Sequence, residues 1–325
     1  MSDVKIVFFD EVDDLCKVSL LFQLSLSWPV TPKALEEIRA NDDRYTPEFG
    51  TFAVTEEGIV AAGHLIMRIP TATLDGKLDV GAVNAVATRP DFGRRGIMTS
   101  IMTRTHDYFR SRHLDYSVLT TSKRLGAALM YERLGYVEVD HSEMAVKYPN
   151  QQRTSAPSVV EVNPVSEADF AHIEDVYQKV VAGSYGFIYR PRNFLKARNI
   201  ISTGTKPEEK LRIARRGSLI TGYAYWESDS THSRSLELLA VDKSSFHALL
   251  SDEERRNPDA GIIVCCDGLT DLEIEWLTAA GYQGPMEGYG GFFVTSLNEK
   301  ADRNRIAAMY GVDIGKFRMG RWDST

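Results

Sequence analysis

The stretch that decides the fold is an apolar octapeptide and the glycine turn behind it, Val80-Gly81-Ala82-Val83-Asn84-Ala85-Val86-Ala87 and Asp91-Phe92-Gly93-Arg94-Arg95-Gly96. The octapeptide is apolar at both alternating positions, which is typical of a strand buried on both faces. Arg89-Pro90 ends it, because proline cannot donate to a β-ladder. Apolar residues then recur at helical spacing from Ile97 to Phe109, which predicts that the glycine turn opens an amphipathic helix.

The glycine turn and the start of this helix have the properties of an anion-binding site. A helix N-terminus offers free backbone N–H groups and the positive end of the helix dipole, and Arg94 and Arg95 add positive charge. From Arg89 to Arg124 there are eight Lys and Arg against three acids, although the net charge of the chain is -7. The pattern favours a phosphate cradle. The alternative is an arginine-rich, solvated turn before an ordinary amphipathic helix.

The elements that follow the helix support the cradle. Tyr116 to Thr121 predicts a second buried strand, and a helical pattern from Leu125 ends in Tyr131-Glu132-Arg133-Leu134-Gly135-Tyr136. In this order the elements resemble the GNAT superfamily of acetyltransferases, whose strand, pyrophosphate loop and helix, strand, and helix ending in Tyr-x-x-x-Gly-Phe/Tyr follow one another. Gly93 and Met98 depart from the usual loop residues. The turn at 94–98 is similar to that of the Eis-like (enhanced intracellular survival) branch.

Length and composition describe an ordinary globular protein with room for two domains. The chain has 325 residues, of which 43% are hydrophobic and 26% charged. Its acidic balance argues against nucleic-acid binding. We see no signal peptide and no apolar run approaching the ~18 residues of a membrane span, so a cytoplasmic location without membrane partners is expected. The three cysteines are then small hydrophobic residues in a reducing compartment, Cys16, Cys265 and Cys266.

Residues 1–150 are expected to form a catalytic GNAT domain that binds acetyl-CoA. Besides the elements above, its pattern predicts two helices and five strands, namely Leu15–Trp28, Pro32–Ala40, Val4–Phe9, Thr51–Val54, Ile59–Ile69, and a final pair at Val137–Val139 and Glu143–Tyr148. In the GNAT pattern the segment before the hairpin carries the acceptor substrate. Trp28, Asp42, Asp43 and Glu48 are therefore candidates to line the acceptor pocket, and the alternative is a packed tryptophan and solvated acids.

The second half of the chain resembles a degenerate repeat of the first. Residues 214–222 match residues 55–63 with glycines five apart, and Leu277 to Tyr282 echoes the end of the GNAT motif. After Val241 there is neither a glycine turn nor an arginine pair, so we expect no cofactor there. We therefore predict a linker at 151–158, a degenerate GNAT-like domain at 159–297 and a C-terminal tail at 298–325. This arrangement resembles Eis-like proteins without their C-terminal sterol-carrier-type domain.

The predicted fold class is α/β (α+β), with two tandem GNAT-like domains that each hold a mixed, mostly antiparallel twisted sheet flanked by helices. The resemblance implies an acetyl-CoA-dependent N-acetyltransferase in which a primary amine attacks the thioester directly, with acetyl-CoA as co-substrate and no metal. It also implies which residues hold the coenzyme. Backbone groups of Val86, Ala87 and Thr88 would hold the pantetheine and thioester, and the pyrophosphate would lie on Arg94, Arg95, Gly96, Ile97, Met98 and Thr99.

The same resemblance implies catalytic roles for two residues. Tyr131 is the expected general acid, because a phenol with a reference pKa of about 10 is protonated at neutral pH and is comparable in acidity to a thiol. The alternative is a tyrosine that only packs. The terminal carboxylate of Thr325 would be the general base, with Asp323 nearby. His64, Glu48 or a chain of waters remain open for that role.

Other function classes remain beside this one. A non-catalytic acyl-CoA-binding or protein-interaction module is the main alternative, and an enzyme that modifies nucleic acid is a third. The expected acceptor is a small-molecule or peptide amine, and the sequence does not select among an aminoglycoside, a lysine, a polyamine and a peptide N-terminus. The resemblance is compatible with a homo-oligomer.

Overall fold

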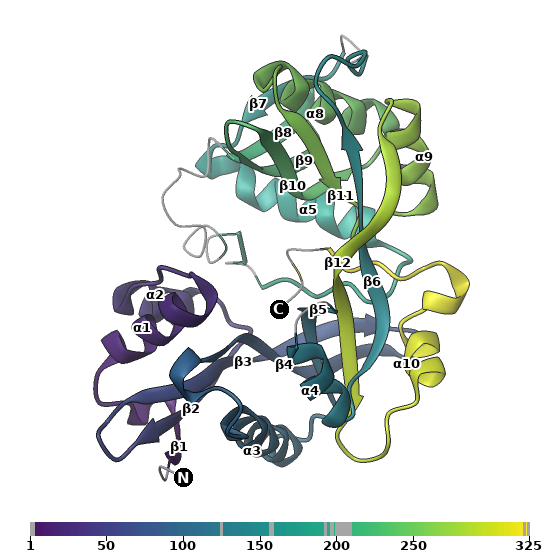
Figure 1. The fold of residues 1–325 in the computed structure, drawn as a ribbon. Helices are drawn as coiled ribbons and strands as arrows, with labels where there is room; N and C mark the ends of the chain where they lie inside the picture. The colour runs from purple at the N-terminus through teal and green to yellow at the C-terminus, as the bar shows by residue number, and fades with distance from the viewer. Residues whose placement is uncertain are drawn as a thin grey trace.

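The strands of the protein form one continuous sheet. A computed structural model describes residues 4–123, 126–155, 159–191, 194–195, 198, 210–320 and 323. Their strands form a 12-stranded sheet in the order β1-β2-β3-β4-β5-β12-β6-β11-β10-β9-β8-β7, which is mixed but mostly antiparallel. The two halves of the chain lie at opposite ends of this sheet, and β6 and β12 cross between them (Figure 1).

The N-terminal half contains the elements that the sequence predicts, with longer strands. The strands are β1 (Val4–Phe8), β2 (Tyr45–Thr55), β3 (Val60–Thr73), β4 (Gly76–Thr88) and β5 (Tyr116–Ser122). The helices are α1 (Leu15–Leu26), α2 (Pro32–Asn41), α3 (Ile97–Ser111) and α4 (Ala127–Arg133). Buried residues of α1 and α3 belong to separate apolar clusters on the two faces of the sheet. The apolar stripe of α3 therefore has the role that its helical spacing predicts.

The C-terminal half repeats this order of elements. Its strands are β7 (Glu161–Pro164), β8 (Leu211–Arg216), β9 (Leu219–Ser228), β10 (His232–Ala240) and β11 (Gly261–Cys265). Its helices are α5 (Phe170–Val181), α8 (Lys243–Arg256) and α9 (Asp271–Ala279). β10 and β11 are parallel and are connected through α8, as β4 and β5 are connected through α3. A third apolar cluster lies beneath α8 and α9.

The two halves exchange their last strands. β12 (Gln283–Ser296) lies between β5 and β6 (Val137–Lys147), and the far end of β6 pairs with β11. The prediction of two strands at 137–139 and 143–148 is wrong, because this segment is a single strand and its partners come from the other half. The polar tripeptide Asp140-His141-Ser142 interrupts the apolar pattern because it lines a cavity and not because the chain turns.

The last described segment runs back between the two halves. It includes α10 (Arg303–Met309) and a 3-10 turn at Val312–Ile314, after which the chain forms a β-bridge between Phe317 and Tyr185. Two buried ion pairs hold it, Arg318 with Glu273 at 2.8 Å and Asp323 with Arg190 at 2.8 Å. In the described part of the chain, no helix is long and apolar enough to cross a membrane.

Candidate active site

The parallel strands β4 and β5 separate partway along their length. Gly81 pairs with Ser117 and Ala82 with Val118, and no further β4–β5 pair is found among the described residues. β4 continues to Thr88 along β3 alone. At the separation Ala85 has φ of +52°, a conformation that non-glycine residues rarely adopt, and the β3–β4 register shifts there. The side of Val86, Ala87 and Thr88 that faces β5 is thus outside the ladder.

The turn before α3 contains two residues in the left-handed conformation. Arg94 and Gly96 both have positive φ, +62° and +76°, and Gly96 is the residue before the first turn of α3. Two residues in the left-handed region wrap the chain so that the backbone can approach an anion at the helix N-terminus. Arg95 is exposed, donates to the backbone oxygen of Asp91 at 2.8 Å and lies over the Phe92 ring. Arg94 is exposed as well.

The two departures from the usual loop pattern have structural explanations. Met98 is buried beneath α3 next to Ile97, so its side chain is part of the core and leaves the backbone of the first turn unobstructed. Thr99, one residue later, is exposed. Gly93 has an ordinary φ of -60°, which a residue with a side chain could also adopt.

Tyr131 lies in the same apolar cluster as the start of α3. Its side chain is 4% exposed and contacts the Tyr136 ring edge to face, with centroids 5.8 Å apart. Burial raises the pKa of the Tyr131 phenol above its ordinary value, so the hydroxyl keeps its proton at neutral pH. The fold therefore brings Tyr131 and Met98 together from segments that are separate in the sequence.

A three-way hydrogen-bond junction joins β5 to α3 below Tyr131. The hydroxyl of Tyr136 lies 3.0 Å from Nε2 of His106 and 2.7 Å from Oγ of Ser117. Ser117 pairs with Gly81, one level before the last β4–β5 pair. This junction fixes α3 against the point where the two strands separate.

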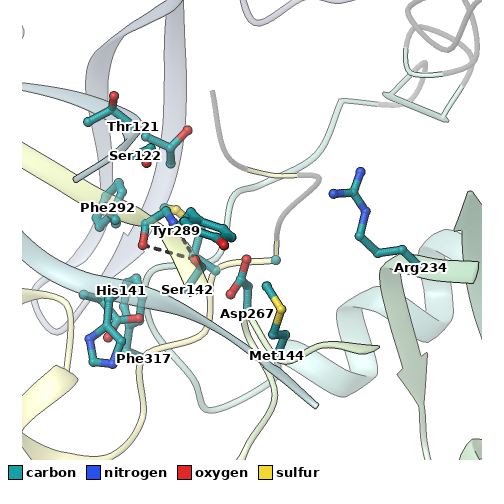
Figure 2. A pocket seen from close by; sticks show the side chains of 16 residues that line it. Thr121, Ser122, His141, Ser142, Met144, Arg234, Asp267, Tyr289, Phe292 and Phe317 are labelled. Carbon is teal, nitrogen blue, oxygen red and sulfur yellow. Dashed lines mark hydrogen bonds between the residues drawn. The ribbon is translucent and has the colours of Figure 1, made fainter. Parts of the chain in front are cut away.

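A cavity of about 370 Å³ lies where β5, β12 and β6 meet the last segment of the chain. Thr120 is opposite Phe292, and Phe292 is opposite Asp140, so the three residues form one row on the same face of the sheet. Figure 2 shows Phe292 and Phe317 on one side of the cavity and Arg234 across from them. Thr120 lies two residues past the last β4–β5 pair, so the cavity adjoins the opening between these strands.

Asp140 is half-buried in this cavity. Burial raises the pKa of its carboxyl group above the usual value, and the like charges of Glu143 and Glu138 act in the same direction. The sequence interpretation missed Asp140, although a polar tripeptide between two apolar strand segments was a signal for it.

The acceptor residues expected from the sequence do not line this cavity. Asp42 is buried in an ion pair with Arg44 at 2.6 Å, Glu48 pairs with Arg112 at 2.7 Å, and the Trp28 ring lies 5.3 Å from that of Phe22. These side chains therefore support the structure of the N-terminal half. Asp43 is exposed.

The candidates for the general base are also placed by the structure. His64 is fully buried and lies 2.8 Å from Oγ1 of Thr105, and burial lowers its pKa to about 3. It is thus a neutral core histidine that cannot reach a substrate. Asp323 is buried and bound to Arg190 and Tyr177. Thr325 lies outside the described residues.

Comparison with known proteins gives the class of this site. Residues 12–139 match the family described as an acetyltransferase (GNAT) domain. This part of the chain is therefore a GNAT domain, a member of a family that transfers acyl groups from acetyl-CoA. No curated protein matches the sequence.

Solved structures share the fold of nearly the whole chain. A GCN5-related N-acetyltransferase from Kribbella flavida is 14% identical with a TM-score of 0.67, and the match covers 90% of this chain and 71% of that one. Eis1 from Mycobacterium abscessus is 14% identical with a TM-score of 0.59, over 91% and 74%. An N-myristoyltransferase from Saccharomyces cerevisiae with bound myristoyl-CoA is 8% identical with a TM-score of 0.60, over 94% and 88%.

Proposed function

We propose that the protein is an N-acetyltransferase that transfers the acetyl group of acetyl-CoA to a primary amine by direct attack. The observation that carries this proposal is the joint position of three features in a GNAT domain. These are the separated strands β4 and β5, the left-handed turn at Arg94 and Gly96, and the buried phenol of Tyr131. Residues 1–150 would hold the reaction site, with 151–158 as linker, 159–297 as a degenerate GNAT-like domain and 298–325 as tail.

Acetyl-CoA would lie in the opening between β4 and β5. Backbone groups of Val86, Ala87 and Thr88 on the side that β5 leaves uncovered are suited to hydrogen-bond the pantetheine and the thioester carbonyl. The pyrophosphate would accept hydrogen bonds from the backbone at the start of α3 and from the two exposed arginines, which are the groups that bind a di-anion. The residues assigned to this part are Arg94, Arg95, Gly96, Ile97, Met98 and Thr99.

Tyr131 would be the general acid. The neutral amine attacks the thioester carbon, and the nitrogen of the tetrahedral intermediate loses a proton to the general base. The C–S bond then breaks as the sulfur takes the phenolic proton, and Tyr131 regains a proton from solvent. The raised pKa of Tyr131 keeps this proton in place before the attack. The carboxylate of Thr325 stays a candidate for the general base on the family resemblance alone.

A calorimetric titration with acetyl-CoA tests the cofactor site. The natural chain should bind one acetyl-CoA, and the double variant Arg94→Ala, Arg95→Ala should bind it more weakly, because each lost charge-assisted hydrogen bond costs about 1.5 to 3 kcal/mol. A screen of amines by thiol release then tests turnover. Equal affinity in both proteins would refute the cradle, and binding without any thiol release would instead support a non-catalytic acyl-CoA-binding module.

A further inference from the structure

We propose that the cavity between β5, β6 and β12 binds an acceptor with two positively charged groups, and that Asp140 binds the one that does not react. This inference rests on the proposed function, because it takes the opening between β4 and β5 as the place where the other amine is acetylated. It names a substrate class, an amine with a second cationic group at the far end of an apolar chain or ring.

The distance follows from the sheet. Thr120, Phe292 and Asp140 are paired across β5, β12 and β6, so Asp140 lies two strand spacings from β5, which is about 10 Å. A single amino group cannot contact Asp140 and also lie beside the opening next to Thr120. An acceptor that uses both places must span this row.

The charge requirement follows from the surroundings of Asp140. Within the described ranges, no cationic side chain forms an ion pair with Asp140, while the cations around it are engaged elsewhere. Lys123 pairs with Glu138 at 2.6 Å and with Glu287 at 3.2 Å, and Arg234 pairs with Glu227 at 3.0 Å. The second carboxylate of the cavity, Asp267, accepts the backbone N–H of Glu143 at 2.9 Å. A half-buried carboxylate that none of the described cations neutralises favours a cationic ligand.

One wall of the space between the two positions is apolar. Phe292 lies under Phe317, with ring centroids 5.8 Å apart and an angle of 26° between the planes, and Met144 and Met319 also line the cavity. The buried pair of Arg318 with Glu273 holds the segment that carries Phe317 and Met319. This wall contacts carbon, so the part of the acceptor that lies along it is expected to be hydrocarbon, while Ser142 and Asp267 add polar groups to the rest of the lining.

The test compares a long diamine with the matching monoamine. 1,8-Diaminooctane is long enough for the row and 1-aminooctane has the same chain with one charge. Competition calorimetry on the full chain should show that the diamine binds about ten-fold more tightly or better, the lower limit for a charge-assisted hydrogen bond. This preference should disappear in Asp140→Asn and persist in Glu143→Gln, which removes a charge from the same strand outside the cavity lining. Acetyl-CoA affinity should be the same in all three proteins.

The outcomes separate this inference from the proposed function, because the binding measurement needs no turnover. An equal preference in the natural chain and Asp140→Asn, no preference in the natural chain, or no binding of either amine would each overturn the role of Asp140. Diamine binding that depends on Asp140, without thiol release from acetyl-CoA, would instead uphold the cation site and refute the transferase. Unchanged acetyl-CoA affinity and melting temperature show that Asp140→Asn is folded.

Discussion

Replacing Tyr131 by phenylalanine removes one oxygen atom and should lower turnover without lowering the free energy of unfolding appreciably. The ring stays in its apolar cluster against Tyr136, and no hydrogen bond of the Tyr131 hydroxyl is found among the described residues. No partner is therefore left unsatisfied, and the free energy of unfolding should change by less than about 1 kcal/mol. Loss of a general acid typically lowers turnover by ~10²- to 10⁴-fold, and we expect at least a ~10-fold decrease, equivalent to about 1.4 kcal/mol of transition-state stabilisation.

Tyr136→Phe is the matched control for this experiment. Its hydroxyl bonds to His106 and Ser117, and both are buried. The control should thus lower the free energy of unfolding by about 1 to 3 kcal/mol and retain most of the turnover. Thiol release at saturating acetyl-CoA, calorimetric affinity and urea unfolding measure the three quantities. Unchanged turnover in Tyr131→Phe, or an equal loss in both variants, would refute the assignment of Tyr131 as the acid.

Three further predictions concern stability. Gly81→Ala should cost about 1 to 3 kcal/mol in urea unfolding, because the added methyl group would lie 2.5 Å from a ring of α3, whereas Gly126→Ala meets no atom within 4 Å, has φ of -58° and should be neutral or stabilising. The pKa of His64 is about 3 when folded and near 6.5 when unfolded, so its contribution to stability is present above pH 6.5 and is lost as the pH falls. The free energy of unfolding should decrease by about 2 kcal/mol between pH 7 and pH 5. A His64→Gln variant should lack this part of the pH dependence. Glu273→Ala should lower the free energy of unfolding by about 3 to 5 kcal/mol, because it leaves Arg318 buried without its ion-pair partner. The double variant with Arg318→Met should recover much of this loss. An unchanged melting temperature in Glu273→Ala would contradict the prediction.

The predicted parts of the fold are those that local patterns determine. The turn at Arg94 to Gly96 and the helix behind it depend on residues within about 15 positions of each other, so glycine placement and helical spacing were sufficient to predict them. The Tyr131 helix was predicted for the same reason. The strand lengths were underestimated, because β2 begins at Tyr45, before the predicted start at Thr51, and β3 continues to Thr73, past the predicted end at Ile69.

The cavity that we propose for the acceptor could not be predicted in this way. Its cavity combines β5, β6, β12 and the last segment of the chain, which are up to about two hundred positions apart, and no periodicity connects them. His64 and Asp42 illustrate the other difficulty. A polar residue in the expected segment looks like a site residue, and only the burial and the contacts with Thr105 and Arg44 show that each belongs to the core.

Through the strand exchange, the C-terminal half contributes to the cavity that adjoins the opening between β4 and β5. β12 supplies Phe292, and the segment held by Glu273 supplies Phe317, so two walls of the cavity come from the half without a glycine turn. Loss of the C-terminal half would expose the edge of β5 next to the coenzyme opening and remove the partners of β6 on both sides. The arginine turn and Tyr131 would remain, but the row from Thr120 to Asp140 would lose its middle residue. Under the proposed function, the C-terminal half therefore contributes to acceptor recognition through β12 and the last segment, although its sequence lacks the glycine turn and the arginine pair.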